Sequence, residues 1–196
     1  MAELDPEFKV VMIGDVSVGK TSLVQRLVND YFTTVSPTVA ASYVQIPMKL
    51  KISEEEEVKI NINLWDTAGA ERFQSLVPLY ARTANGVVIV FDVTNPHSFD
   101  AARRWYQKVL DEVTTPPQPL LCANKTDLAP GADVSDYKEW ALTNGIIFKQ
   151  TSALTGLNVQ EAFTELAMEM YKKDCQAEHD KLDITQENTK EKKKCC

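Results

Sequence analysis

The chain has 196 residues and a formal net charge of −7. This length suits one domain with a sizeable core, and the acidic balance argues against a general nucleic-acid binder. No apolar run approaches the ~20 residues that a membrane-crossing helix needs, and the acidic start predicts neither a secretory nor a transit peptide.

The first apolar run, Phe8–Ile13, leads directly into the motif G-x-x-x-x-G-K-[ST] at Gly14–Thr21. A helical pattern follows, so the motif has the strand–loop–helix setting of a phosphate-binding loop. Glycines let backbone N–H groups close on phosphate oxygens, and the helix start offers its positive end to the anion. We expect Lys20 to reach the β- and γ-phosphates and Thr21 to ligate Mg²⁺. The alternative is a glycine-bearing turn that binds nothing.

Two segments of alternating polarity, 44–50 and 58–64, flank the charged reversal Ser53–Glu57. They predict an antiparallel hairpin with one buried face. Its period of two sends the even-numbered residues inward, so Tyr43 and Trp65 should lie on the outward face. The alternative is that a neighbouring helix covers Trp65.

The rest of the chain alternates apolar strand runs with helical patterns. The further strands are expected at Val87–Phe91, Leu120–Ala123 and Ile146–Lys149, and helices near Ser98–Leu110 and Asn158–Lys172. Together these elements predict a single α/β domain with a six-stranded, mostly parallel sheet, one antiparallel hairpin strand, and helices on both faces. After Tyr171 the periodicity stops, and a charged stretch without an apolar face predicts a disordered linker.

A D-x-x-G motif, Asp66–Gly69, follows the second strand of the hairpin. A carboxylate at a strand end can hold Mg²⁺ through water, and Gly69 can bring its N–H against a terminal phosphate. Many turns match this pattern, so alone it identifies no site.

An N-K-x-D motif, Asn124–Asp127, follows the next strand but one. The Asp127 carboxylate can accept hydrogen bonds from N1–H and the 2-amino group of guanine, a donor pair that adenine lacks. Asn124 would tie this loop to the phosphate loop, and the Lys125 stem would lie along the purine. Thr151–Ala153 follows the last strand, where the Ala153 N–H would contact the guanine O6. Taken alone, each of these segments is equally consistent with a polar turn.

These motifs each follow a strand, in a fixed order, and in this the chain resembles the Ras superfamily of small GTPases over about residues 8–171. Three features resemble the Rab family: Trp65–Gly69 followed by Glu71–Phe73, Val90–Thr94, and the Cys195-Cys196 terminus. Residues 37–43 and 124–128 favour its endosomal branch. The resemblance implies a GTP/GDP switch that uses Mg²⁺, hydrolyses GTP, and directs vesicle traffic by recruiting effectors in the GTP state.

The resemblance also assigns roles to individual residues. Thr38 corresponds to the switch I threonine, Phe32 to the aromatic beside the guanine, and Glu71 to about Ala81 to switch II. The implied catalytic residues are Lys20, Thr38 and Gly69, and the implied metal ligands are Thr21, Thr38 and Asp66. Nucleotide binding is expected from Asp15, Val16, Ser17, Val18, Gly19, Lys20, Thr21, Ser22, Phe32, Thr38, Asp66, Gly69, Asn124, Lys125, Asp127, Ser152, Ala153 and Leu154. Effectors are expected to contact the aromatic triad of Tyr43, Trp65 and Tyr80.

The sequence departs from the family pattern where hydrolysis is concerned. Ala70 stands at the position of the glutamine that orients the attacking water, and a methyl group forms no hydrogen bond. Val16 puts a branched side chain in the phosphate loop, where it would crowd the water or an arginine finger. The Phe32–Thr38 spacing is one residue shorter than in the family, and Ala40 replaces a common glycine. We therefore predict slow intrinsic hydrolysis.

The terminal residues Cys195 and Cys196 are either two idle thiols or, given the Rab resemblance, a double geranylgeranylation site. The cysteines show neither disulfide nor zinc spacing, which favours a reducing cytosol. We expect an N-terminal extension at 1–7, a GTPase domain at 8–173 and a flexible tail at 174–196. Lys192–Lys194 would add attraction to anionic lipid.

The resemblance implies partners that handle a lipidated switch. These are effectors, an exchange factor, a GTPase-activating protein, a prenylation escort and a GDP-dissociation inhibitor. We expect a monomer on the cytosolic face of intracellular membranes, with an endosome favoured, that cycles with the cytosol and binds no nucleic acid. Two alternatives stay open: a GTP-bound scaffold that hardly hydrolyses, and a P-loop kinase or ATPase, against which Asp127 argues.

Overall fold

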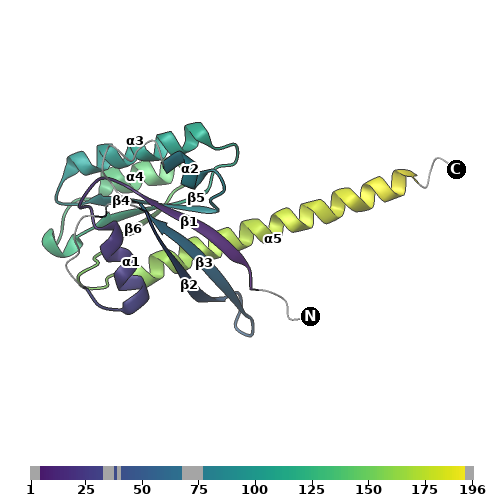
Figure 1. Cartoon of the computed structure of the whole chain (residues 1–196), viewed down its shortest axis with the longest axis horizontal. Coiled ribbons are helices and arrows are strands. Elements are labelled where there is room, and N and C mark those ends of the chain that lie inside the picture. The colour runs from purple at the N-terminus through teal and green to yellow at the C-terminus, as the bar shows by residue number, and fades with distance from the viewer. Residues whose placement is uncertain (1–4, 33–37, 39–40, 68–76, 193–196) are drawn as a thin grey trace.

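A computed structural model describes residues 5–32, 38, 41–67 and 77–192, without the side chains of 77–78 and 178–192. Its strands form one sheet in the order β2-β3-β1-β4-β5-β6 (Figure 1). Their bounds are β1 (Glu7–Ile13), β2 (Ser42–Lys51), β3 (Glu57–Asp66), β4 (Gly86–Asp92), β5 (Gln118–Asn124) and β6 (Ile147–Gln150). The β2–β3 pair is antiparallel and the other neighbouring pairs are parallel, which confirms the predicted mixed sheet.

Helices cover both faces of this sheet (Figure 1). One face carries α1 (Lys20–Asn29) and α5 (Val159–Lys192), and the other carries α2 (Val77–Ala81), α3 (Pro96–Glu112) and α4 (Ser135–Thr143). Val10 and Met12 of β1 enter the first core, whereas Val11 and Ile13 enter the second. Because a central parallel strand is buried on both faces, its sequence is a continuous apolar run rather than an alternating one.

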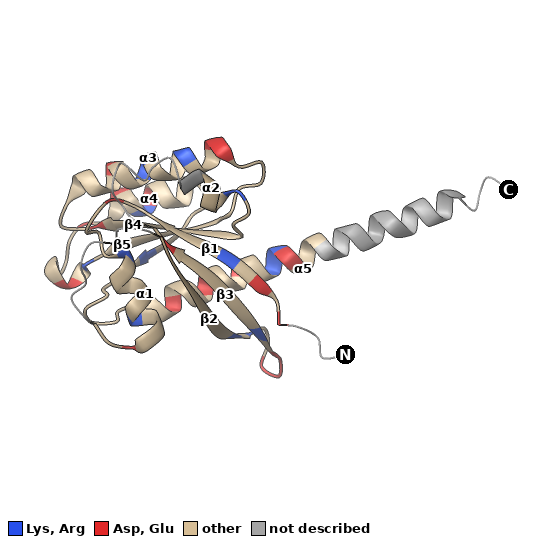
Figure 2. Ribbon diagram, viewed as in Figure 1, with Lys and Arg blue, Asp and Glu red and all other residues tan. Residues whose placement is uncertain are grey.

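The β2–β3 hairpin has the register that the alternation predicts. Ile46 lies opposite Ile62, and both are buried, whereas Tyr43 lies opposite Trp65 on the other face. The acidic reversal at Ser53–Glu57 joins the two strands at the tip of the hairpin (Figure 2). The hairpin therefore buries one face against α1 and α5 and leaves the opposite face for the aromatic residues.

The last helix differs from the prediction of a disordered linker and flexible tail. α5 continues to Lys192 and extends well past the sheet (Figure 1). Residues 172–192 contain no glycine or proline and are rich in strong helix formers. Because adding a residue to an existing helix costs far less than nucleating one, the packed first half of α5 supports a polar second half. Among the described residues, no helix is long and apolar enough to cross a membrane.

The buried face of the hairpin supports a stability prediction. We expect Leu64→Ala, at a fully buried position, to lower the free energy of unfolding by about 2–5 kcal/mol because it removes packed methyl groups and leaves a cavity. Lys59→Ala, on the exposed face of the same strand, should change it by less than about 0.5 kcal/mol. Urea unfolding at one fixed nucleotide concentration measures both. Equal losses in the two variants would contradict the inward register.

Candidate nucleotide-binding site

The candidate site lies at the carboxyl edge of the sheet. Loops that follow β1, β3, β5 and β6 leave the sheet at this edge, because these strands are all parallel to one another. Ligands of open α/β sheets bind in the crevice outside the carboxyl ends of the strands. The fold thus brings together the phosphate loop, Asp66, the Asn124–Asp127 motif and the Thr151–Leu154 segment, which are far apart in the sequence.

Two glycines of the phosphate loop are required by close approach as well as by conformation. Gly14 has a φ of +138°, and a Cβ there would lie 2.2 Å from the Val90 carbonyl oxygen. Gly19 has a φ of +101°, and its Cβ would lie 2.3 Å from Nδ2 of Asn124. These positions admit no side chain, so the loop closes tightly between β4 and the Asn124 amide.

Lys20 begins α1 and is buried, with 6% of its surface exposed. Its Nζ donates hydrogen bonds to the carbonyl oxygens of Gly14 at 2.9 Å and Asp15 at 2.8 Å. Burial lowers the pKa of Lys20 to about 8, although the charges of Asp66 and Asp15 oppose the shift. The loop therefore holds a desolvated ammonium whose charge a bound phosphate would stabilise.

Three oxygens converge beside this lysine. Thr21 Oγ1 donates to Asp66 Oδ2 at 2.5 Å and lies 2.8 Å from Thr38 Oγ1. Since the Thr21 hydroxyl has one hydrogen, which Asp66 accepts, Thr38 is the donor in the second contact. The predicted metal ligands Thr21, Thr38 and Asp66 thus lie together.

The Asp66 carboxylate fits a cation. It is 1% exposed, and its Oδ1 is the buried side-chain atom without a hydrogen-bond partner among the described residues. Burial raises the pKa of Asp66, while the Thr21 hydrogen bond and the Lys20 charge oppose that rise. Within the described part of the chain, no three His, Cys, Asp or Glu side chains cluster as metal ligands. A carboxylate with hydroxyls and phosphate oxygens is the type of set that Mg²⁺ takes.

The base-side loops are joined to the phosphate loop through Asn124. Its Nδ2 donates to the Val18 carbonyl oxygen at 2.9 Å, as the sequence predicts. Its Oδ1 accepts from Thr151 Oγ1 and from the Ala153 N–H, each at 3.3 Å. The N–H expected to contact guanine O6 therefore has a long hydrogen bond to Asn124 in this structure. Asp127 Oδ1 accepts from Ser152 Oγ at 2.5 Å, so both guanine-loop residues are already oriented.

Two residues to which the sequence analysis assigned no role hold these loops. Asp92, at the end of β4, accepts a hydrogen bond from Lys125 Nζ at 2.6 Å. Burial raises the pKa of Asp92, but hydrogen bonds from Lys125 and Thr94 outweigh it, so the net shift is downward. Arg26 of α1 donates to the Ala153 carbonyl oxygen at 2.8 Å. Neither pairing has a local motif, so no sequence signal reveals it.

The remaining predicted residues line the rim of the site or lie outside the described residues. Val16, Phe32 and Leu154 are 45%, 39% and 49% exposed. Ser17 is exposed and has a φ of 63°, and Asp15 Oδ1 accepts the Val16 N–H at 2.9 Å. Ser22 follows Thr21 in the first turn of α1. Gly69, Ala70, Ala40, most of switch II, Cys195 and Cys196 lie outside the described residues.

The aromatic triad forms one contiguous row. The Trp65 ring lies between Tyr43 and Tyr80, with centroid distances of 5.3 Å to each. Tyr43 is 52% exposed, and its hydroxyl donates to Asn63 Oδ1 at 2.7 Å. Trp65 is half-buried because Tyr80 of α2 packs against it. The outward face was predicted correctly, and α2 covers Trp65 only in part.

Comparison with known proteins identifies the relatives of this chain. The model of the Ras family matches residues 9–172. The Ras-related protein RABF2b of Arabidopsis thaliana is 38% identical over 162 residues, which cover 81% of this chain and 78% of that protein. The Ras-related protein Rab-8B of Homo sapiens is 36% identical over 168 residues, covering 85% and 79%. Rab-8 of Diplobatis ommata is 36% identical over 168 residues, covering 85% and 78%.

The lowered pKa of Lys20 predicts proton uptake on binding. Burial lowers the pKa of Lys20 from its ordinary 10.5 to about 8. At a pH between these two values, the Lys20 amine is therefore mostly neutral in the protein without nucleotide. Phosphate oxygens stabilise the charged form, so binding above pH 8 should take up protons and affinity should fall as pH rises. Titration calorimetry in two buffers of different ionisation enthalpy, at about pH 6.5 and 9, measures this uptake. Equal proton uptake at both values would contradict the assignment.

Proposed function

This chain belongs to the Ras family as a small GTPase of the Rab type, and on that premise we propose that it controls membrane traffic as a slowly hydrolysing switch. It binds GTP and GDP with Mg²⁺, and it hydrolyses GTP to GDP and phosphate. In the proposal, the GTP state recruits effectors to vesicles, and the intrinsic return to the GDP state is slow.

The observation that carries the switch proposal is the position of Thr38. Its hydroxyl lies 2.8 Å from Thr21 Oγ1, in the group that includes the Asp66 oxygen for which the described residues offer no hydrogen-bond partner. Thr38 belongs to the segment that follows Phe32, whereas Thr21 lies in the first turn of α1 and Asp66 at the end of β3. A segment that reaches the metal group through one hydroxyl can be held there by the γ-phosphate side and released after hydrolysis.

Each residue of the site has a distinct role in this proposal. Lys20 pairs with the β- and γ-phosphate oxygens, and the backbone N–H groups of residues 15–22 surround the phosphates. Thr21, Thr38 and Asp66 are the residues that would hold Mg²⁺. Mg²⁺ held by these residues would supply positive charge that stabilises the phosphate oxygens during transfer. Asp127 selects guanine, and the N–H groups of Gly69 and Ala153 complete the contacts to the γ-phosphate and the base.

Ala70 is the reason to propose slow hydrolysis. Its methyl group provides no hydrogen bond to orient water, and the branched side chain of Val16, which is exposed, would crowd the water or an arginine finger. Within the family an activating protein supplies catalytic groups in trans, so turnover need not be lost. The same substitution favours a second candidate, a GTP-bound scaffold that hardly hydrolyses. The nucleotide carried by freshly purified protein, followed over hours, separates the two.

We expect Ala70→Gln to accelerate single-turnover GTP hydrolysis by at least about tenfold, because the amide can orient the attacking water. Ala177→Gln, an exposed alanine of α5, is the matched control and should leave the rate unchanged. Release of labelled phosphate from preloaded protein measures all three chains. If the native chain already hydrolyses as fast as the Ala70→Gln variant, the proposal of slow turnover is wrong.

The membrane part of the proposal rests on the C-terminus. Cys195 and Cys196 follow α5 closely in the sequence, and Lys192–Lys194 stand directly before them. Two lipid chains meet the requirement for stable anchoring, and nearby lysines add attraction to anionic lipid. We propose that residues 8–173 act as the GTPase domain and 174–196 as an arm to the cytosolic face of an intracellular membrane, with the endosome favoured. An exchange factor would replace the bound nucleotide, and a prenylation escort and a GDP-dissociation inhibitor would move the protein between the membrane and the cytosol.

Lipidation has a direct test. We expect intact-mass spectrometry of protein from cells to find two prenyl groups, and Cys195→Ser with Cys196→Ser to shift the protein from the membrane fraction to the supernatant. A single serine variant should bind membranes more weakly and reversibly, since one chain anchors poorly. Cys175→Ser, at an exposed position of α5, is the control. Two free terminal thiols in cellular protein would overturn this part of the proposal.

A further inference from the structure

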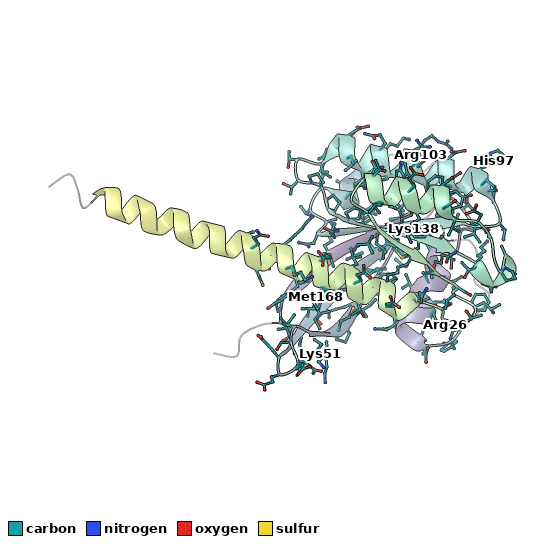
Figure 3. All side chains as sticks on the ribbon, turned by 180° about the vertical axis from the view of Figure 1, so that it is seen from behind. Arg26, Lys51, His97, Arg103, Lys138 and Met168 are labelled. Atoms are coloured by element: carbon teal, nitrogen blue, oxygen red, sulfur yellow. The ribbon has the colours of Figure 1, made fainter. Side chains whose placement is uncertain are left out.

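Arg26 connects the helix of the phosphate loop with the loop of the base. Its side chain is largely covered, with 14% exposed. Nε donates to the carbonyl oxygen of Ala153 at 2.8 Å, and Nη2 donates to that of Leu154 at 2.5 Å. These bonds span more than a hundred residues of sequence. Figure 3 marks Arg26 on α1, close to the start of α5.

The third nitrogen of the same guanidinium holds the end of α1. Nη1 donates to the Asp30 carbonyl oxygen at 2.7 Å, and Asp30 ends the helix in the left-handed conformation with a φ of 55°. Asp30 is two residues before Phe32 and leads into the switch I segment. One planar cation thus fixes three backbone carbonyls from two separate loops, a geometry that a lysine cannot reproduce.

The loop that Arg26 holds is the one that orients Asp127. Ser152 Oγ donates to Asp127 Oδ1 at 2.5 Å and also accepts the Thr155 N–H at 3.1 Å. The turn closes through the Gly156 N–H, which donates to the Ser152 carbonyl oxygen at 2.9 Å. Ala153 and Leu154 lie inside this turn, so fixing their carbonyls from outside fixes the Ser152 hydroxyl and, through it, the Asp127 carboxylate.

We infer that Arg26 is a positioning residue for guanine selection and retention. It acts through the Ala153–Leu154 carbonyls on Asp127, and it ties the base loop to α1 and to the start of switch I. The inference rests on the proposed guanine site. It predicts that a displacement of the end of α1 loosens the base loop, so that a partner which moves Asp30 would speed nucleotide release from the base side.

The test compares release of GDP with release of inosine diphosphate, which lacks the 2-amino group that Asp127 is expected to bind. We expect Arg26→Gln to speed GDP release by about tenfold, the scale of losing a charge-assisted hydrogen bond. Release of inosine diphosphate should be accelerated less. The ratio of the inosine diphosphate release rate to the GDP release rate should therefore fall towards one. Arg26→Lys, which keeps the charge but lacks the planar fork, should give intermediate values. Arg104→Gln, exposed on α3, should change neither rate.

Asp127→Asn and the double variant separate this inference from the proposed function. If Asp127→Asn narrows the ratio and Arg26→Gln narrows it no further in that background, Arg26 acts through Asp127. If Asp127→Asn narrows the ratio but Arg26→Gln speeds release of both nucleotides equally, the role of Arg26 is only structural and the inference is wrong. If Asp127→Asn has no effect on the ratio, the guanine assignment fails and the inference fails with it. Should Arg26→Gln not fold, the ratio for Arg26→Lys decides in the same way.

Discussion

The structure depends on a buried ammonium and a buried carboxylate whose hydrogen-bonding capacity the described residues satisfy only in part. Among the residues that the structure describes, Lys20 Nζ donates to two backbone carbonyls, and one oxygen of Asp66 has no hydrogen-bond partner. Burying unpaired charge is costly, and the opposite pKa shifts of these groups express that cost. A bound nucleotide with Mg²⁺ offers the anionic oxygens and the cation that both groups lack. Binding therefore relieves a penalty built in during folding, which explains why the surrounding loop allows so little freedom.

The second constraint is that the phosphate and base halves of the site are held to one another by backbone contacts. Asn124 bonds the Val18 carbonyl oxygen from one side, at the point where Gly19 leaves no room for a side chain. Arg26 of α1 donates a hydrogen bond to the Ala153 carbonyl oxygen of the base loop. A shift of the phosphate loop or of the base loop would therefore disturb hydrogen bonds to the other. Nucleotide affinity should depend on both loops together.

What the sequence predicted well are features with a local signature. The hairpin register follows from a period of two, and the phosphate loop follows from spaced glycines between a strand and a helix. The Arg26 and Asp92 contacts were not predictable, because a side chain that bonds a distant carbonyl leaves no pattern near itself. The extension of α5 was missed for the opposite reason. The loss of an apolar face after Tyr171 predicts the end of the helix, but a helix already nucleated by packing continues through polar helix formers.

In the proposed switch, the aromatic triad would report the state of the nucleotide. Trp65 directly precedes Asp66, and Tyr80 lies on the short helix that follows segment 68–76, where Gly69 and Ala70 stand. The ring contacts of Trp65 with Tyr43 and Tyr80 are each worth about 0.5–1.5 kcal/mol beyond their buried area. Since a ligand shifts an equilibrium only by its differential affinity for the two states, such small contacts suit a surface that must rearrange. A fully buried Trp65 would resist such a rearrangement, and a fully exposed Trp65 would have no contacts that the rearrangement could change.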